Sequence, residues 1–263
     1  MIFKSAVGLV AVIASAATMF AQPATIAPPG QAAKAGFTNL VFNEDFRNLD
    51  LSDPDRDTTV WRKNRSLGLP ISDDRFSVSN GVLTITTPPG SHRGVCSQIT
   101  THANAPKQSK HEFLFGYFEA RLRFDWNPDN WDSFWLESAV PVKLRQNPQG
   151  SDSTRWCEID IMEPQNTPRV YIGTVHDFYA GKNVQVAFSK IELPGRVKLS
   201  DWNTFGALWQ PGRVSWYLNN KLVGTTPTPP ICDHDRLSLI LAAAKQRGDE
   251  DQKLEVNWVH VYQ

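Results

Sequence analysis

The feature that most constrains the fold is a set of short segments in which apolar and polar residues alternate. The clearest is GYFEARLRF, at residues 116–124, where one face of a strand carries the charged residues and the other carries the apolar ones. Further strand-like segments lie at 81–86, 214–218, 237–244 and 254–262, and Asn80-Gly81 and Asn219-Asn220 are typical of hairpin turns. Long helical periodicity is missing. The sequence therefore predicts an all-β sandwich or jelly roll.

The first 36 residues differ in composition from the rest. Lys4 precedes an uncharged apolar run from Ala6 to Ala17, and small residues follow. This pattern predicts a secretory signal peptide over residues 1–21, hence a secreted protein without membrane contact after cleavage. Residues 22–36 are rich in Pro, Ala and Gly and carry one charge, so we expect a flexible linker. Residues 37–263 show no internal repeat and no second linker, and we expect one domain.

Charge and aromatic content narrow the classes of function. The formal net charge is +0, whereas nucleic-acid binders usually carry a basic excess, so we expect no nucleic-acid partner. The chain also contains 9 Trp, and indole rings often bind the apolar faces of sugars. Composition alone favours the other interpretation, an aromatic-rich β core. We expect a monomer.

The most informative segment is WCEIDIME, from Trp156 to Glu163. Like charges this close raise one another's pKa and cost stability, so a purely structural role for all three carboxylates is disfavoured. In a strand, Glu158 and Asp160 face the same way as Trp156, but Glu163 would face the opposite side. One extra residue in a β-bulge near Ile161-Met162 would return Glu163 to the shared face, and bulges are common beside active sites.

Such a bulge would bring the two glutamates to the separation of a retaining glycosidase pair, roughly 5–5.5 Å. In that chemistry one carboxylate attacks the sugar, and the other, kept protonated by its neighbour's charge, donates a proton to the leaving oxygen.

The segment resembles the signature of glycoside hydrolase family 16, E-I-D-x-x-E in its bulged form, as in laminarinases, lichenases and agarases. Other segments resemble the family in the same order along the chain: 41–46, 117–121, 133–136, 209–217 and 257–262. The resemblance implies a β-jelly-roll sandwich of two antiparallel sheets with a concave cleft for a polysaccharide. It makes Glu158 the nucleophile, Glu163 the acid/base and Asp160 the supporting acid, with no cofactor required for the chemistry.

The resemblance also implies a set of substrate-binding residues. Trp156 would be a stacking platform, Glu119 and Arg121 would line the cleft, and His176 would lie near the leaving-group side. Trp131 and Trp135 share one face by their even spacing. Each has a structural alternative: a cross-strand ion pair for Glu119 and Arg121, core packing for the tryptophans, and a hydrogen-bonded structural role for the histidine.

Two departures from the family concern calcium and cysteine. Many relatives hold a structural Ca²⁺ with groups near Glu44, Gly81 and a C-terminal Asp, and this chain has Asn257 in that last place, which weakens a hard-cation site. The family bridge from Cys96 to a position before a Trp-Arg pair is missing, because Val60 stands there.

Three cysteines leave at least one thiol unpaired, and their spacing matches no zinc site. The strand parity of Cys157 points it into the packed side of its sheet. We therefore expect a buried thiol there and no disulfide involving Cys157.

Several functions remain open. The leading one is endo-hydrolysis of β-1,3- or mixed β-1,3/1,4-glucan, and the alternative substrate is a red-algal galactan such as agar or porphyran. Transglycosylation is disfavoured because plant-type transferases usually lack the bulge. A non-catalytic glucan-binding protein is disfavoured because both Glu158 and Glu163 are present.

Overall fold

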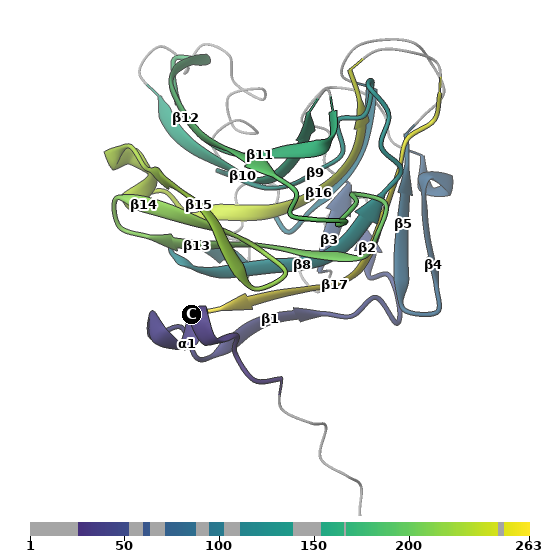
Figure 1. Ribbon diagram of the computed structural model, residues 1–263, viewed down its shortest axis with the longest axis horizontal. Helices are drawn as coiled ribbons and strands as arrows, with labels where there is room; N and C mark the ends of the chain where they lie inside the picture. The colour runs from purple at the N-terminus through teal and green to yellow at the C-terminus, as the bar shows by residue number, and fades with distance from the viewer. Residues whose placement is uncertain are drawn as a thin grey trace, which may run out of the picture.

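The computed structural model describes residues 26–52, 60–63, 72–87, 95–102, 111–138, 154–165, 167–246 and 250–263. The predicted signal peptide therefore lies outside the described residues. Two sheets lie face to face (Figure 1), which confirms the predicted all-β jelly roll. All strand pairs are antiparallel except β2 with β3. Within the described part of the chain, no helix is long and apolar enough to cross a bilayer.

The two sheets are built as follows. The eight-stranded sheet has the order β15 (Lys221–Pro227), β14 (Arg213–Leu218), β13 (Asn203–Gln210), β8 (Gly116–Phe124), β17 (Lys253–Tyr262), β5 (Val82–Thr86) and β4 (Phe76–Ser79), with β1 (Leu40–Glu44) on β17. The nine-stranded sheet has the order β12 (Lys182–Glu192), β11 (Thr167–Tyr179), β10 (Arg155–Gln165), β9 (Ser133–Ser138), β16 (Leu237–Lys245), β6 (Val95–Thr100), β3 (Trp61–Lys63) and β2 (Leu51–Ser52), with β7 (Glu112–Phe113) on β16. The nine-stranded sheet is bent, and its concave side faces away from the other sheet (Figure 1).

Two hairpins have the tight turns that the sequence predicted. Asn80 and Gly81 join β4 to β5 with φ of 52° and 71°, and Asn219 and Asn220 join β14 to β15 with φ of 49° and 64°. Positive φ at both central residues matches the right-handed twist of the flanking strands, and Asn and Gly tolerate it best. These turns fix the register of both hairpins.

The core lies between the sheets and follows the predicted alternation. On β8, Phe118, Ala120 and Leu122 are fully buried against the other sheet. On β10, Cys157 and Ile159 are fully buried in the same layer. The side chains between them in sequence therefore face away from the core, and on β10 that side is the concave one.

The expectation of a flexible linker over residues 22–36 is wrong for its second half. Gly30–Lys34 form α1, a short helix that lies against the eight-stranded sheet near the C-terminus (Figure 1). Ala32 is fully buried in a cluster with Tyr117, Leu208 and Tyr262, and Gln31 donates a hydrogen bond of 2.7 Å to the Tyr117 hydroxyl. Composition suggested a linker because small residues are common in linkers, but here they allow close packing on an aromatic surface.

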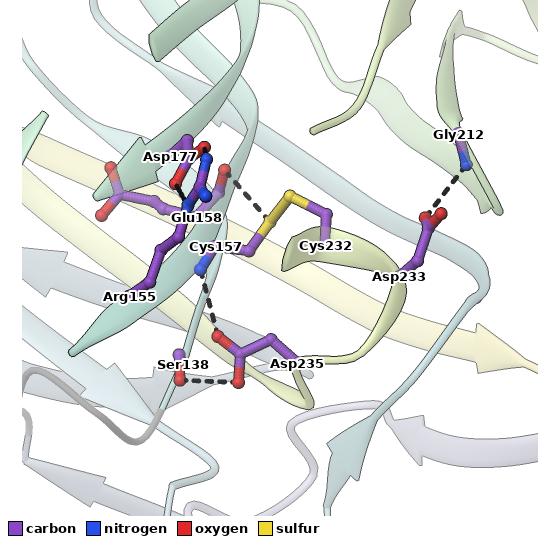
Figure 2. Close-up of a disulfide and its surroundings, with 9 residues drawn as sticks. All are labelled: Ser138, Arg155, Cys157, Glu158, Asp177, Gly212, Cys232, Asp233 and Asp235. Carbon is purple, nitrogen blue, oxygen red and sulfur yellow. Dashed lines mark hydrogen bonds and ion pairs between the residues drawn. A yellow bond between two sulfur atoms is a disulfide. The ribbon is translucent and has the colours of Figure 1, made fainter. Parts of the chain in front are cut away.

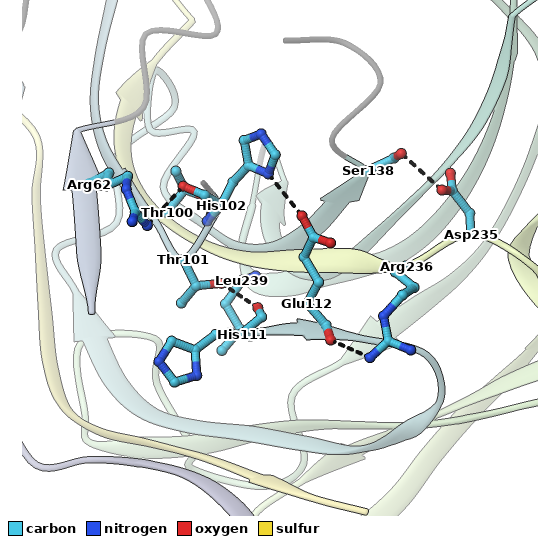
Figure 3. Close-up of polar contacts among 10 residues, drawn as sticks. All are labelled: Arg62, Thr100, Thr101, His102, His111, Glu112, Ser138, Asp235, Arg236 and Leu239. Carbon is cyan, nitrogen blue, oxygen red and sulfur yellow. Dashed lines mark hydrogen bonds and ion pairs between the residues drawn. The ribbon is translucent and has the colours of Figure 1, made fainter. Parts of the chain in front are cut away.

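Polar contacts join β6 to β7 and β16 (Figure 3). Leu239 donates its backbone N–H to the hydroxyl of Thr101, and that hydroxyl donates to the His111 carbonyl. The next residue, His102, contacts the Glu112 carboxylate through Nδ1 at 3.2 Å. These bonds hold the strands on which one wall of the concave side is built.

The prediction that Cys157 forms no disulfide is wrong. Cys157 does point into the packed layer, as its parity indicated, but Cys232 points into the same layer from the 3-10 helix η3 (Pro230–Asp233) and bridges it (Figure 2). Both residues are fully buried, and their Cα atoms are 5.1 Å apart. Cys96 remains free and buried, in agreement with the missing family bridge.

Asp235 reinforces the attachment of β10 at this point. Its carboxylate accepts the backbone N–H of Cys157 at 3.0 Å and the Ser138 hydroxyl at 3.0 Å (Figure 2). The disulfide and Asp235 both attach Cys157 of β10 to the segment that leads into β16. Cys157 directly precedes Glu158, so the attachment also holds Glu158 in place.

We predict that loss of the bridge lowers stability. The bond joins residues 75 apart in sequence, and closing such a loop in the unfolded chain is worth about 2–4 kcal/mol. The double variant Cys157→Ala/Cys232→Ala should lose free energy of unfolding in that range in urea, relative to the control Cys96→Ala. Equal stability of the double variant and the control, or three titratable thiols in the unreduced denatured chain, would contradict the prediction.

Candidate active site

The three acidic residues of β10 lie on the concave face because of a bulge at the predicted place. The pairing of β10 with β11 shifts between Asp160 and Glu163, and its pairing with β9 shifts between Asp160 and Met162. Ile161 and Met162 are both buried in the core, so the extra residue is absorbed on the apolar side. Glu163 thereby regains the face of Glu158, and all three carboxylates line one cavity. The predicted bulge is confirmed.

His176 on β11 lies directly opposite Glu158 in the strand register. Its Nε2 is 3.0 Å from Oδ2 of Asp160 and 3.8 Å from Oε1 of Glu158. The side-chain nitrogen of Asn183 lies 2.6 Å from Nδ1 on the other side of the ring, so the imidazole is held between β12 and the acids of β10. His176 on β11 thus contacts both Asp160 and Glu158 on β10.

Trp131 contacts Glu163 directly. Its indole N–H donates a 2.7 Å hydrogen bond to Oε1 of the carboxylate. An indole N–H can only donate, so this bond occupies Oε1 as an acceptor and leaves Oε2 as the oxygen that can carry a proton.

The loop that carries Trp131 is held by buried polar bonds. The backbone N–H of Trp131 donates to the Ala244 carbonyl at 2.8 Å, and Ala244 donates its own N–H to Asp132 at 2.9 Å. Asn130 donates to the other oxygen of Asp132. Burial raises the pKa of Asp132 to about 7. Trp131 is therefore placed by backbone bonds to β16 rather than by its ring alone.

Burial dominates the electrostatics of the cluster. It raises the pKa of Glu158 well above the ordinary value, the charges of Asp160 and Glu137 raise it further, and His176 lowers it. Burial also raises the pKa of Asp160, with Glu163 and Glu137 adding to the effect. For Glu163, burial raises the pKa, whereas the Trp131 hydrogen bond and His176 lower it. Ionisation of all three carboxylates at once is therefore unfavourable, and the cluster retains a proton that the carboxylates share.

The cavity over these acids has a volume of about 210 Å³. Trp131 and Trp135 both line it, as their even spacing predicted, and neither is a core residue. The remaining lining residues come from β6, β9 and β16: Cys96, Gln98, Ser133, Glu137, Ala242 and Ala244. Within the described structure, the indole N–H of Trp135 is buried without a hydrogen-bond partner, which leaves it for a ligand.

Three of the expected substrate-binding residues have different surroundings. Glu119 and Arg121 lie on β8, which belongs to the eight-stranded sheet. The acid cluster lies on β10 of the other sheet. Glu119 is buried beside His260 on the neighbouring strand β17, which is a cross-strand pair, whereas Arg121 lies over the ring of Trp202 and makes a cation–π contact instead. Alternation placed them correctly on the polar face of a strand but could not tell which sheet that strand joins.

Trp156 shares the face of Glu158, as predicted, yet it offers no open ring plane. It is 6% exposed and stacks on Phe178 at 5.0 Å between ring centroids. The sequence alone does not show that Phe178 on β11 lies opposite Trp156.

The sequence interpretation missed Glu137 and Asn183. Glu137 pairs with Glu158 across β9 and β10, and its even spacing from Trp135 could have revealed its face. Asn183 reaches His176 from β12, and no local signal marks that contact.

The residues named for a possible calcium site are linked by hydrogen bonds. The Asn257 amide donates a 2.9 Å hydrogen bond to the Gly81 carbonyl. The Glu44 carboxylate accepts the Phe46 N–H at 2.9 Å and the Trp61 indole N–H at 3.0 Å. A structural calcium at this place stays a prediction.

Comparison with known proteins agrees with this geometry. The family model described as Glycosyl hydrolases family 16 matches residues 67–259. The endo-1,3-1,4-beta-glycanase EglC of Rhizobium meliloti is 26% identical in an alignment of 234 residues that covers 77% of this chain and 45% of that protein. A glucan endo-1,3-beta-glucosidase of Cryptopygus antarcticus is 29% identical over 131 residues, which are 49% of this chain and 43% of that protein. The chain spans less than half the length of these curated relatives.

Solved structures show the same fold. The laminarinase catalytic domain of Thermotoga petrophila has a TM-score of 0.63 at 20% identity, covering 86% of this chain and 97% of that one. A laminarinase from a Flavobacterium species has a TM-score of 0.64 at 19% identity, covering 86% of this chain and 100% of that one.

We predict that the Trp131 hydrogen bond lowers the pKa of Glu163. Trp131→Phe keeps an aromatic ring but removes the donor that stabilises the carboxylate, so the pKa of Glu163 should rise. Trp135→Phe removes an indole N–H from the same cavity without touching Glu163 and is the matched control. Carboxyl ¹³C NMR titration, with Glu163→Gln to assign the resonance, measures both. A pKa of Glu163 that moves equally in the two variants, or in neither, would be inconsistent with this role.

Proposed function

Since the chain belongs to glycosyl hydrolase family 16, we propose that it is an endo-acting, retaining hydrolase of a β-linked glucan. The observation that carries the proposal is the bulge in β10, which turns Glu158, Asp160 and Glu163 toward one cavity. A retaining mechanism needs two carboxylates that flank the scissile bond, one to attack the anomeric carbon and one to transfer a proton to the leaving oxygen.

In the first step of the proposed mechanism each of these residues has one role. Glu158 attacks the anomeric carbon as a carboxylate, and the bond to the leaving oxygen breaks as Glu163 delivers its proton from Oε2. Burial raises the pKa of Glu163, and the Trp131 bond to Oε1 holds its carboxyl group in place. Burial raises the pKa of Glu158 as well, so the division of roles rests on the family pattern, in which the first glutamate is the nucleophile. Asp160 and His176 contact each other beside Glu158, and His176 favours the charged form of Glu158 by lowering its pKa.

In the second step the protonation states reverse. Once Glu158 is a neutral ester, its negative charge no longer opposes ionisation of Glu163. Glu163 then removes a proton from water, the water oxygen attacks the anomeric carbon, and Glu158 leaves as a carboxylate. Two inversions at one carbon give net retention of the β configuration.

The relatives support a β-1,3- or mixed β-1,3/1,4-glucan as substrate. Their names describe endo-1,3-1,4-beta-glycanases and a glucan endo-1,3-beta-glucosidase. We also propose that residues 1–21 direct export of the protein, which would place it where polysaccharides are found.

The substrate prediction is release of reducing sugar from laminarin or lichenan. A screen over laminarin, lichenan, agarose, carrageenan and xyloglucan measures it, with Glu158→Ala as the inactive control. Activity confined to agarose or another galactan would overturn the glucan assignment and keep the mechanism.

The stereochemical prediction follows from the carboxylate pair. The first sugar formed by the native enzyme should have the β configuration, as observed by ¹H NMR before mutarotation. Glu158→Ala should lose on the order of 10⁴-fold or more in turnover while keeping the fold, because no other group can form the ester. Azide or formate should restore a slow reaction with inverted configuration. An initial α product from the native enzyme would rule out Glu158 as nucleophile.

A further inference from the structure

Three side chains on β10 and β11 bring metal-ligating atoms together. One carboxylate oxygen of Glu158, one of Asp160 and a ring nitrogen of His176 all lie within 4.8 Å of one another. The Nε2 atom of His176 is 3.0 Å from Oδ2 of Asp160 and 3.8 Å from Oε1 of Glu158. In the described ranges of the chain, no other group of His, Cys, Asp and Glu side chains gathers three ligand atoms this closely.

The separations fit a small transition-metal ion. Bonds from Zn²⁺ to nitrogen and oxygen are about 2.0–2.2 Å long, so two ligand atoms of a tetrahedral ion lie about 3.3–3.6 Å apart. The two separations from Nε2, 3.0 Å and 3.8 Å, lie just below and just above that range. Small shifts of the side chains would therefore bring all three atoms to one ion.

The imidazole is also oriented as a metal ligand usually is. A histidine that binds a metal through one ring nitrogen commonly has a hydrogen-bond partner on the other nitrogen, which fixes the ring. The Asn183 amide lies on Nδ1 of His176 at 2.6 Å and so takes that place. An amide can turn its oxygen toward an N–H of the ring, and Nε2 then has the lone pair that a metal needs.

The charge of the cluster favours a cation. Burial raises the pKa of both Glu158 and Asp160, and the neighbouring carboxylates raise it further, because several negative charges are close together. A divalent ion would neutralise two of these charges. Both residues line the cavity of about 210 Å³, so there is room for a water molecule as a fourth ligand.

Thr174 is an independent sign that a ligand belongs beside the cluster. It lies directly opposite Asp160 in the register of β10 and β11, so the two side chains share the concave face. Thr174 is 3% exposed, and its hydroxyl is buried without a hydrogen-bond partner in the part of the chain that the structure covers. A hydroxyl in this state can accept a hydrogen bond from a metal-bound water.

From these observations we infer that Glu158, Asp160 and His176 form a binding site for a divalent transition-metal ion such as Zn²⁺, and that this ion inhibits the enzyme. The binding rests on the geometry alone, whereas the inhibition rests on the proposed function. An ion bound to the carboxylate of Glu158 withholds it from the anomeric carbon, so the ion and the reacting glycan exclude each other. One imidazole with two carboxylates suits Zn²⁺ better than Mg²⁺, which prefers a full set of oxygen ligands.

Isothermal titration calorimetry of the full chain with ZnCl₂ tests the site through a matched pair of variants. Glu158→Gln removes a ligand, whereas Glu163→Gln makes the same chemical change in the same cluster but removes none. The Kd for Zn²⁺ should rise by about 100-fold or more in Glu158→Gln and in His176→Gln, because even a residue that only orients a metal ligand is worth about 10–100-fold. In Glu163→Gln the Kd should change far less.

Equal weakening in Glu158→Gln and Glu163→Gln would mean that the ion responds only to the charge of the cluster, which would overturn the inference. Zn²⁺ affinity that is unchanged in His176→Gln would also overturn it. MgCl₂ should bind at least about tenfold more weakly than ZnCl₂, and equal affinity would contradict the ligand set. Circular dichroism of each variant reports whether the fold is kept.

The rate of laminarin hydrolysis measures the inhibition. With laminarin well below its KM, ZnCl₂ at about ten times its Kd should lower the initial rate about tenfold by mass action, and a chelator should restore it. Zn²⁺ that binds without slowing an active enzyme would overturn the inhibitory role. A chain that binds Zn²⁺ through these ligands but hydrolyses neither laminarin nor lichenan would support the metal site and overturn the glucanase function.

Discussion

The site depends on a change of parity within one strand. A regular strand alternates its side chains between two faces, and the two glutamates of β10 are five positions apart, so without an extra residue one of them would enter the core. The bulge at Ile161 and Met162 places two apolar side chains in succession on the buried side and returns Glu163 to the concave side. The contact of Glu163 with Trp131 and its place beside Glu158 in the cavity follow from that one insertion.

Placing three acids together is costly, and the surrounding structure offsets the cost in different ways. His176 and Trp131 approach the carboxylates from β11 and from the loop before β9, each with a donor aimed at an oxygen. Behind the strand, the Cys157–Cys232 bridge and Asp235 hold β10 next to Glu158. The bulge is thus fixed from the core side while the acids are stabilised from the cleft side.

The sequence predicted what depends on local order along the chain. The strand alternation, the Asn-containing hairpins, the bulge and the shared face of Glu158, Asp160 and Glu163 all follow from spacing of a few residues. The errors concern contacts between distant segments. Strand parity gave the direction of Cys157 correctly, but only the fold shows that Cys232 arrives from 75 residues away. Likewise, alternation could not decide which sheet β8 joins, so Glu119 and Arg121 were assigned to the wrong face of the molecule.

The position of β12 has a consequence for the behaviour of the protein in solution. It is paired only with β11 among the described strands, so it is an edge strand, and Val186 and Phe188 are exposed on it. An edge strand can pair with a strand of another molecule, and natural proteins commonly discourage this with lysine. Here Lys182 and Lys190 lie on the same strand and are exposed. The strand therefore combines an apolar surface that favours association with two positive charges that oppose it.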